Sequence, residues 1–489
     1  MKNKLQDVLL KYNVQNISID SRNIKKGDAF FAITGANADG NKYIDSVLKS
    51  GASVIFTDNA SNQDNKKNII YIENIRQALA LAAEMLYPEA PENIVAVTGT
   101  NGKSSVVSYV HQILTLLGCS SASIGTLGID ATCEIDKIFP DISGLTTADP
   151  IKFRKILQIL RRKKIDNVAF EASSHGIDQY RIGDIKVSTA AFVSFSQDHL
   201  DYHKNMDEYL HTKLILFTRN LSQNGEAVIN SEMMSVDYIK DFLDKNSISY
   251  SAVGKNADVR ITRCATSIDG QEIECEFDGK QYQFNTDIIG SFQATNILIA
   301  AKLVYNLNID SEKIINVLSK LRSVKGRLER VTNASHEYQI FIDYAHTPDA
   351  LESSLLELQK VKKASGDLFV IFGCGGDRDA KKRPIMGKVA SKIADHVIIT
   401  DDNSRTEDGS KIRKEIIDGM EDDNIKSHII EIPDRGNAIS DTIATKMQKD
   451  DILLVAGKGH EDYQIIGSKI IKFSDAEVVK KSLYSANKL

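Results

Sequence analysis

Short apolar runs alternate with longer stretches of helical periodicity along most of the chain. Near the N-terminus the apolar runs are DAFFAITG, ASVIFTD and NIIYIEN, and helical patterns cover residues 43–50 and 77–87. Alternation of this kind is typical of an α/β sheet. Pro88 and Pro91 then interrupt the pattern, so we predict a small N-terminal α/β domain over residues 1–91.

The second segment repeats the alternation on a larger scale. We predict strands at residues 94–97, 121–129, 167–172 and 189–195, with helices at 106–117 and 151–163. Residues 228–284 are strand-rich, and residues 290–307 form a buried helix. These patterns predict a central domain with a largely parallel sheet over residues 92–326, ending at a hinge in KGRLER.

The third segment, residues 327–489, predicts another α/β domain. Its expected strands are residues 339–342, 368–372, 396–400 and 452–455, and its expected helices are 349–362, 382–393 and 410–420. Polar clusters follow these strands, as they follow the strands of the central segment. We therefore expect binding groups at the strand ends of both sheets.

The first central strand leads into the sequence TGTNGKS and then into a helix. Gly99 and Gly102 free the backbone to curl, and amides at the start of the helix suit an anion. Lys103 can reach terminal phosphates and Ser104 can ligate Mg²⁺. The turn is shorter than the usual P-loop, which would need glycine at Val97. A plain strand-to-helix turn is the alternative, but the G-K-S context favours ATP.

Polar residues after two other strands indicate a metal site. Glu171 and His199 are plausible Mg²⁺ ligands beside Ser104, although Mg²⁺ prefers oxygen and an isolated histidine is more often structural. Asn296, near the start of the buried helix, can cap that helix or contact an adenine edge.

Composition narrows the class of protein. The 489 residues suffice for about three domains. A net charge of -5 gives no sign of a basic surface that would bind nucleic acid, so nucleic acid is not the expected partner. The five cysteines are scattered without C-x-x-C spacing, which favours a reducing compartment, the cytoplasm. No apolar stretch of about 18 residues appears, so we expect no membrane insertion.

Eight motifs occur in a fixed order: TGTNGKSS, EASSH, SQDHLDYH, EYLHTKLILF, KGRLER, DYAHTPDAL, GCGGDRDAKKRP and GKGHEDYQ. Together they resemble the Mur ligases of bacterial cell-wall synthesis, specifically the type that adds the third peptide residue to UDP-N-acetylmuramoyl-L-alanyl-D-glutamate. The resemblance implies a nucleotide-sugar-binding domain, a central ATPase and a C-terminal Rossmann-like domain that presents the amino acid. It also implies ATP and Mg²⁺ as cofactors and a monomer.

The resemblance implies an ADP-forming ligase with an acyl-phosphate intermediate. The implied catalytic residues are Lys103, His199, Lys213, Arg327 and Asp343. Of these, Arg327 and Asp343 would close over ATP. The implied metal ligands are Ser104, Glu171, His199 and a carbamylated Lys213. The ATP contacts would be Gly99, Thr100, Asn101, Gly102, Lys103, Ser104, Ser105 and Asn296.

Lys213 lies in a helical pattern, where a lysine is usually a solvated surface residue. A free amine has a reference pKa of about 10.4 and would repel Mg²⁺ as a cation. A carbamate is instead an anionic oxygen ligand. Burial beside a cation would depress the pKa of the amine and favour its reaction with CO₂.

The resemblance also implies two substrate sites. The UDP-sugar peptide would contact Ile19, Ser21, Ala36, Asn37, Ala38, Thr146, Thr147, Ser173, Gln179 and Arg181. The amino acid would contact Arg378, Asp402, Asn403, Ser404, Arg405, Gly457 and Glu461.

The expected amino acid is meso-2,6-diaminopimelate. Family members that use it resemble D-N-P-R at the acceptor loop, and this chain has Asp402, Asn403, Ser404 and Arg405. The Arg405 guanidinium can bind the additional carboxylate with two parallel hydrogen bonds, whereas the ω-ammonium of L-lysine would face a like charge.

Three alternatives remain open. The chain could perform the same step with L-lysine, or it could be a ligase similar to folylpolyglutamate synthetase. In a different class, it could be a non-catalytic ATP-binding scaffold, but that leaves Glu171, His199, Lys213 and Arg327 without a role.

Overall fold

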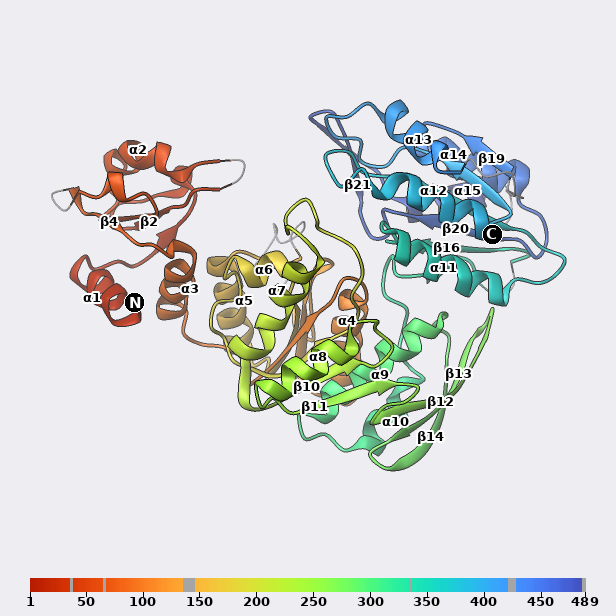
Figure 1. Cartoon of the computed structure of the whole chain (residues 1–489), viewed down its shortest axis with the longest axis horizontal. Coiled ribbons are helices and arrows are strands. Elements are labelled where there is room, and N and C mark those ends of the chain that lie inside the picture. The colour runs from red at the N-terminus through yellow and green to blue at the C-terminus, as the bar shows by residue number, and fades with distance from the viewer. Residues whose placement is uncertain (36–37, 65–66, 135–145, 334–335, 421–427, 486–489) are drawn as a thin grey trace.

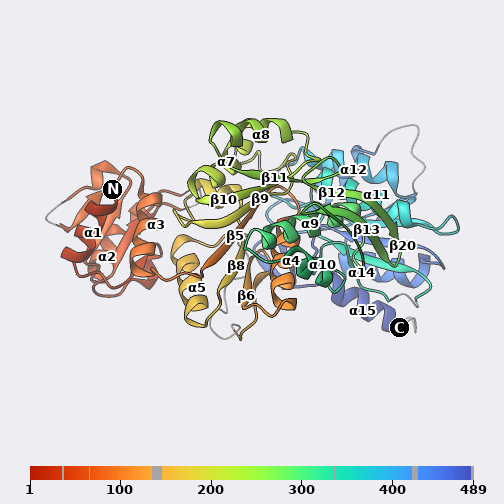
Figure 2. The ribbon, with the colours of Figure 1, turned by 90° about the horizontal axis from the view of Figure 1, so that it is seen from below.

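The computed structural model describes residues 1–35, 38–64, 67–134, 146–333, 336–420 and 428–485, and these residues build three main sheets, one in each of three domains, and a separate two-stranded hairpin (Figure 1). Each of the three sheets falls inside one of the predicted segments, while the predicted boundaries at residues 91 and 326 stay predictions. Figure 2 shows the N-terminal domain at one end of the molecule and helix α15 at the other.

The N-terminal domain is a small parallel sheet of four strands in the order β1-β2-β3-β4. Phe31 and Phe56, on adjacent strands, pack with ring centroids 4.7 Å apart in its core. The strands are β1 (Ile17–Ser18), β2 (Ala29–Ala32), β3 (Val54–Thr57) and β4 (Ile69–Tyr71), and the helices are α1 (Lys2–Lys11), α2 (Ile44–Lys49) and α3 (Ile75–Leu86). The predicted apolar runs therefore form the strands.

The central sheet has ten strands in the order β14-β13-β12-β11-β10-β9-β5-β8-β6-β7. Strand β5 lies between β9 and β8. The strands are β5 (Asn93–Thr98), β6 (Ser121–Gly125), β7 (Gly128–Ala131), β8 (Asn167–Glu171), β9 (Val187–Phe192), β10 (Leu221–Asn230), β11 (Tyr250–Gly254), β12 (Val259–Ser267), β13 (Gly270–Phe277) and β14 (Lys280–Thr286).

Helices cover both faces of this sheet. Val95 and Val97 of β5 face α4 and α9, whereas Ile94 and Ala96 face α5 and α7, as the period of two in a strand requires. The helices are α4 (Lys103–Leu116), α5 (Pro150–Arg162), α6 (Ser174–Asp178), α7 (Met206–Arg219), α8 (Val236–Lys245), α9 (Ser291–Tyr305) and α10 (Ser311–Leu318). Strand β5 is thus buried from both sides at the centre of the domain.

The sheet is largely parallel, as predicted, with three exceptions: β7 at one edge and β13 and β14 at the other run antiparallel to their neighbours. One expectation about this sheet needs correction. The apolar run at residues 121–129 is a hairpin of β6 and β7, not one strand. Gly128 has φ +92°, which lets the chain reverse where the apolar pattern alone appeared continuous.

The C-terminal sheet has the order β15-β16-β20-β17-β18-β19 and is parallel except for β15. Helices α11 to α13 pack on one face, and α14 and α15 on the other. The elements are β15 (Glu329–Arg330), β16 (Gln339–Asp343), α11 (Pro348–Val361), β17 (Leu368–Phe372), α12 (Lys382–Ile393), β18 (His396–Ile399), α13 (Gly409–Asp418), β19 (His428–Glu431), α14 (Arg435–Asp441), β20 (Ile452–Ala456), the hairpin β21 (Tyr463–Ile466) and β22 (Lys469–Lys472), and α15 (Asp475–Ser485).

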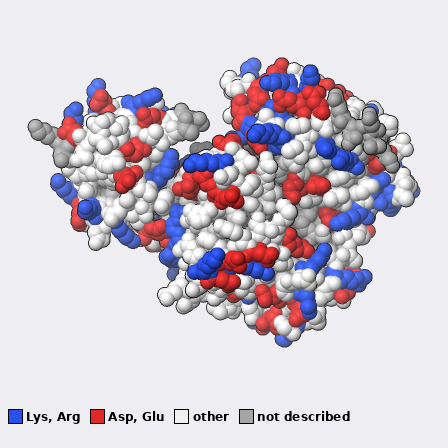
Figure 3. Space-filling model, in the orientation of Figure 1, with Lys and Arg blue, Asp and Glu red and all other residues white. Residues whose placement is uncertain are grey.

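Charged side chains of both signs are intermixed on the face of the molecule shown in Figure 3. No helix among the described residues is long and apolar enough to cross a membrane.

A fully buried ion pair joins helices α14 and α15. Arg435 donates from Nε and Nη2 to the two carboxylate oxygens of Asp475, at 2.7 and 2.8 Å. The same Nη2 donates to the carbonyl of Ala456, at the end of β20, at 2.8 Å. The pair therefore connects the last helix to the sheet.

We expect Asp475→Ala to destabilise the C-terminal domain by about 3–5 kcal/mol, because it leaves the Arg435 charge buried and unpaired. Chemical denaturation of the whole chain, followed at the transition of this domain, measures the loss. Glu312→Ala breaks an exposed pair with Lys280 and should cost about 1 kcal/mol or less. Equal losses in the two variants would contradict this account.

Candidate active site

The turn after β5 has a backbone that only glycine permits at two positions. Gly99 has φ +152° and Gly102 has φ +85°. A Cβ on Gly99 would lie 2.6 Å from Cγ2 of Val193. The turn is held against the chain after β9, because the Thr100 amide donates to the carbonyl of Ser194 at 2.9 Å. These contacts fix the shape of the turn, and the start of α4 lies directly behind it.

Two lysine amines converge on the carbonyl of Gly99. Lys103 Nζ donates to it at 2.9 Å and to the Thr100 carbonyl at 2.8 Å. Lys213 Nζ donates to the same Gly99 oxygen at 2.9 Å and lies 4.4 Å from the ring centroid of Tyr209. Lys213 is only 1% exposed. The structure thus brings Lys213 from its helix α7 to the phosphate-binding turn.

The Lys213 amine has an unusual environment. Burial lowers its pKa well below the usual value, and the charge of Lys103 lowers it further, while Asp198 acts in the opposite direction. Burial also lowers the pKa of Lys103, against the attraction of Glu171. A lowered pKa increases the neutral fraction of the amine, which is the form that reacts with CO₂.

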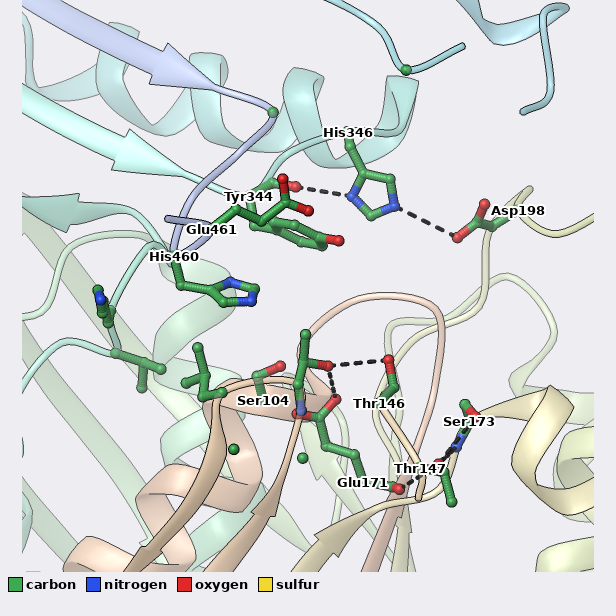
Figure 4. Close-up of a pocket in the computed structure, with 18 of the residues that line it drawn as sticks. Ser104, Thr146, Thr147, Glu171, Ser173, Asp198, Tyr344, His346, His460 and Glu461 are labelled. Carbon is green, nitrogen blue, oxygen red and sulfur yellow. Dashed lines mark hydrogen bonds and ion pairs between the residues drawn. The ribbon is translucent and has the colours of Figure 1, made fainter. Parts of the chain in front are cut away.

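Glu171 ends strand β8 and is 2% exposed. Its Oε1 accepts from the Thr126 amide at 2.9 Å and its Oε2 from the Thr126 hydroxyl at 3.1 Å. A Cβ on Gly125 would lie 2.1 Å from Oε1, so glycine at this position makes room for the carboxylate. Thr126 Oγ1 also lies 3.2 Å from Thr146 Oγ1, which links Glu171 to the predicted substrate residues (Figure 4).

Asp198 lies near histidines of two domains, and Figure 4 shows the one from the C-terminal domain, His346. Asp198 Oδ2 is 3.4 Å from Nε2 of His199 and 4.0 Å from Nε2 of His346. Burial raises the pKa of Asp198, but the two histidines and Lys382 bring it down to about 2. Burial lowers the pKa of His199 to about 4, against the attraction of Asp198, so this imidazole is neutral near pH 7.

Residues of the C-terminal domain also reach the phosphate-binding turn. Arg327 Nη2 donates to Ser104 Oγ at 2.8 Å, and its guanidinium lies 4.6 Å from the ring centroid of Tyr344. Asn101 Nδ2 donates to Asp349 at 3.3 Å. A cavity of about 180 Å³ beside these contacts is lined by Asn101, Gly102, Ser105, Asn296, Arg327 and Asp343, among others.

A second, larger cleft of about 1170 Å³ lies between the central and C-terminal domains. It brings together thirteen of the predicted site residues: Ser104, Thr146, Thr147, Glu171, Ser173, Arg181, His199, Arg378, Asp402, Asn403, Arg405, Gly457 and Glu461. Its walls also include Asp198, Tyr344, His346, Lys382 and His460, which were not predicted as site residues. The motifs SQDH, DYAH and GKGHE contain four of these five, so the signal was present in the sequence.

Thr147 organises the central wall of this cleft. Its hydroxyl donates to the carbonyl of Glu171 at 2.9 Å and lies 3.0 Å from Ser173 Oγ. Its carbonyl accepts from Arg181 Nη1 at 3.0 Å, and Arg181 Nη2 donates to Gln179 Oε1 at 2.9 Å. The predicted residues of this wall therefore form one hydrogen-bonded network.

The opposite wall contains the acceptor loop, which we define as residues 401–407. Asn403 Nδ2 donates to Glu461 at 3.0 Å, and the buried Lys458 donates to Glu461 at 2.9 Å. Arg405 Nη1 donates to the carbonyl of Gly376 at 2.7 Å. Among the described residues, Nε and Nη2 of Arg405 have no hydrogen-bond partner. One edge of this guanidinium is thus available to a ligand.

Gln179 and Ser404 do not line the cleft themselves but lie beside residues that do, and the N-terminal domain holds the other predicted substrate residues. Ile19, Ser21 and Ala38 line neither cavity. Ala36 and Asn37 lie outside the described residues. Next to Ser21, Arg22 is paired with Asp20, and this hydrogen bond lowers the pKa of the Asp20 carboxyl to about 2. The structure does not bring this group of residues into the cleft.

The described residues contain no group of three or more His, Cys, Asp and Glu side chains that could hold a metal ion by themselves. Glu171 and the neutral His199 are a partial set of donors, and Mg²⁺ is commonly held by one or two carboxylates together with substrate phosphates and water. The residues present therefore fit a magnesium ion that binds with a nucleotide.

The three-domain α/β fold, with a phosphate-binding turn facing a cleft under the C-terminal domain, defines a class of nucleotide-dependent enzyme. Family models match residues 13–101 (Mur ligase family, catalytic domain), 97–304 (Mur ligase middle domain) and 326–459 (Mur ligase, glutamate ligase domain). The chain belongs to the Mur ligase family.

Its similarity to individual members extends over the whole chain. A UDP-N-acetylmuramoyl-L-alanyl-D-glutamate–2,6-diaminopimelate ligase of Rickettsia bellii is 51% identical and covers 98% of both chains, and that of Rickettsia montanensis is 48% identical with the same coverage. A solved structure of an enzyme with this name is 28% identical, with a TM-score of 0.67, covering 97% of this chain and 96% of the other. The predicted family and fold are confirmed.

Asp343 yields a pH-dependent prediction. Burial raises its pKa to about 6, although Arg327 lowers it. Between the unfolded pKa of about 3.9 and pH 6 the folded chain binds more protons, so stability falls as pH rises through this range. We expect Asp343→Asn to be more stable than wild type at pH 8 by about 1–3 kcal/mol, and equal to it near pH 4.

Denaturation across this pH range measures the difference. Glu352→Gln, at an exposed carboxylate of α11, is the control and should follow wild type at every pH. A constant offset between Asp343→Asn and wild type would contradict the assignment.

Proposed function

We propose that this chain is an ATP-dependent ligase that adds meso-2,6-diaminopimelate to UDP-N-acetylmuramoyl-L-alanyl-D-glutamate, the step named in its relatives. The observation that carries the proposal is the large cleft, because its central wall ends at Ser104 and Glu171 while its C-terminal wall carries Arg405. A phosphate site and an acceptor site therefore face each other across one cavity.

The nucleotide would bind at the turn after β5. Backbone amides of Gly99 to Ser105 and the Lys103 ammonium would hold the phosphates. Asn296 lines the smaller cavity, and the adenine would bind there. Arg327 already contacts Ser104 from the C-terminal domain and would add positive charge beside the phosphates. Asp343 would close over ATP together with Arg327. Together these groups suit a ligand with several negative charges, such as ATP.

Magnesium would neutralise charge on the β- and γ-phosphates when it is bound. The residues that would hold it are Ser104, Glu171, His199 and Lys213 as a carbamate. The Lys213 proposal is supported by the buried amine, its lowered pKa and its contact with Gly99.

In the first step the D-glutamate γ-carboxylate oxygen would attack the γ-phosphorus of ATP, and ADP would leave. In the second, an amine of diaminopimelate would attack the carbonyl carbon of the acyl phosphate. Phosphate would leave with the bonding electrons, and the amide would form as nitrogen loses a proton. Cationic side chains around the turn would stabilise the charge that develops in both steps.

The two substrates would approach from different directions. The UDP-sugar would contact Ile19, Ser21 and the segment 36–38 in the N-terminal domain, and its peptide would run along Thr146, Thr147, Ser173, Gln179 and Arg181. Diaminopimelate would lie between Arg378, Asp402, Asn403, Ser404, Arg405, Gly457 and Glu461. We further propose that the enzyme works as a cytoplasmic monomer.

Arg405 supports diaminopimelate over L-lysine as the acceptor. The described residues leave its Nε and Nη2 without hydrogen-bond partners, and this edge of a guanidinium matches a carboxylate. An ammonium at the same place would meet like charge. The scaffold alternative gives no reason for two lysine amines, one of them fully buried, at one carbonyl. The folylpolyglutamate-type alternative gives no reason for the N-terminal domain.

The main test is ADP formation that requires both the UDP-muramoyl dipeptide and an amino acid. Wild type should prefer diaminopimelate to L-lysine. Arg405→Ala should raise KM for diaminopimelate about ten- to hundredfold, because a charge-assisted pair is lost. Arg322→Ala, at an exposed surface arginine, is the matched control. Preference of the wild type for L-lysine would refute this acceptor.

Lys213→Ala should reduce ligation by about a hundredfold or more, because an anionic ligand near the phosphates is lost. Short carboxylic acids should restore part of the activity, whereas Lys204→Ala, at an exposed lysine of the preceding segment, should behave as wild type. Nuclear magnetic resonance with isotopically labelled CO₂ reports the carbamate directly. A nucleotide-bound enzyme with an unmodified amine would disprove this role.

A further inference from the structure

Two loops form the C-terminal wall of the cleft. The glycine loop, residues 373–378, ends with Arg378, and the acceptor loop, residues 401–407, carries Arg405. They follow the neighbouring parallel strands β17 and β18. The Gly376 amide donates to the carbonyl of Asn403 at 2.9 Å, and Arg405 Nη1 donates to the carbonyl of Gly376. The position of each loop therefore depends on the other.

An ion pair between a buried arginine and a partly exposed glutamate lies behind both loops. Arg383, at the start of α12, is 1% exposed. Its Nη1 and Nη2 donate to the two carboxylate oxygens of Glu407, each at 2.9 Å, and Nη2 also donates to the carbonyl of Gly375 at 3.2 Å. One guanidinium thus contacts the last residue of the acceptor loop and the backbone of the glycine loop.

Glu407 contacts the glycine loop as well. Its Oε1 accepts from the amide of Asp377 at 2.6 Å, next to Arg378. Asp377 has φ +54°, a left-handed backbone that a non-glycine residue adopts at a cost. The hydrogen bond of Arg383 is the largest influence that lowers the pKa of Glu407, so this carboxylate is an anion near pH 7. Glu407 therefore holds a strained turn at the edge of the cleft.

We propose that Arg383 and Glu407 are positioning residues of the acceptor site, which set the direction of Arg378 and Arg405 without contacting the amino acid. This inference rests on the proposed function and says how the acceptor site would select its amino acid. Two guanidinium groups can select a dicarboxylic amino acid over a monocarboxylic one only if their loops are held in fixed relative positions.

The chain contains a matched control for the pair. Glu415, on α13, accepts from Arg383 Nη1 at 2.7 Å and is exposed to a similar extent, 32% against 28% for Glu407. Among the described residues, the Glu415 carboxylate makes no hydrogen bond to either loop. Removal of its charge perturbs the same arginine but not the contact with Asp377.

The experiment compares kcat/KM for diaminopimelate and for L-lysine in wild type, Glu407→Gln and Glu415→Gln. We expect Glu407→Gln to raise KM for diaminopimelate about tenfold, with KM for ATP unchanged, so that preference over L-lysine falls. Glu415→Gln should keep the wild-type preference. Glu407→Asp keeps the negative charge on a shorter side chain and should give a smaller loss of preference. This variant replaces Glu407→Gln in the experiment if Glu407→Gln does not fold.

The possible results are distinct. If wild type does not use diaminopimelate, the proposed function fails. If wild type prefers it but both variants at position 407 keep that preference, the positioning role is overturned. Equal losses of kcat/KM for both amino acids would also overturn it, and so would equal losses in Glu407→Gln and Glu415→Gln. An ion pair that only stabilises the fold would give such equal losses.

Discussion

The crowding of basic side chains around the carbonyl of Gly99 is the constraint on which the site depends. Lys103 and Lys213 both donate to this oxygen, and Arg327 contacts the next serine along the turn. Burial disfavours the charged form of an amine, and a neighbouring cation disfavours it further. Burial therefore lowers the pKa of Lys213, and the charge of Lys103 lowers it further.

The same constraint explains why the domains must be docked. Lys103 comes from α4, Lys213 from α7 and Arg327 from the start of the C-terminal segment, so no single element can assemble the charge. Contacts beside the turn, such as Asn101 to Asp349, hold the C-terminal domain in place. Asp198 and His346 approach across the cleft in the same way (Figure 4). A site divided between domains can admit large substrates and still surround the reacting atoms.

On the C-terminal side of the cleft the roles of the charges are reversed, because an anionic carboxylate there holds the loops that carry cationic side chains. Glu407 and Arg383 lie behind the cleft and fix two loops, whereas Lys458 neutralises Glu461 within it. Within the described part of the chain, Arg405 keeps one edge without a hydrogen-bond partner because its other edge contacts the backbone. Recognition in such a site comes from the alignment of a few charged groups, and the sheet beneath them supplies that alignment.

The sequence by itself determined the phosphate-binding turn, the alternating elements and the three-sheet plan, because these follow from local periodicity and from glycine and proline at particular positions. It missed the reversal at Gly128, since an apolar pattern does not register a left-handed glycine. It also could not pair Asp198 with His346 or Arg383 with Glu407. Such pairs lie far apart along the chain, and which charges meet is decided only when packed strands bring their ends together.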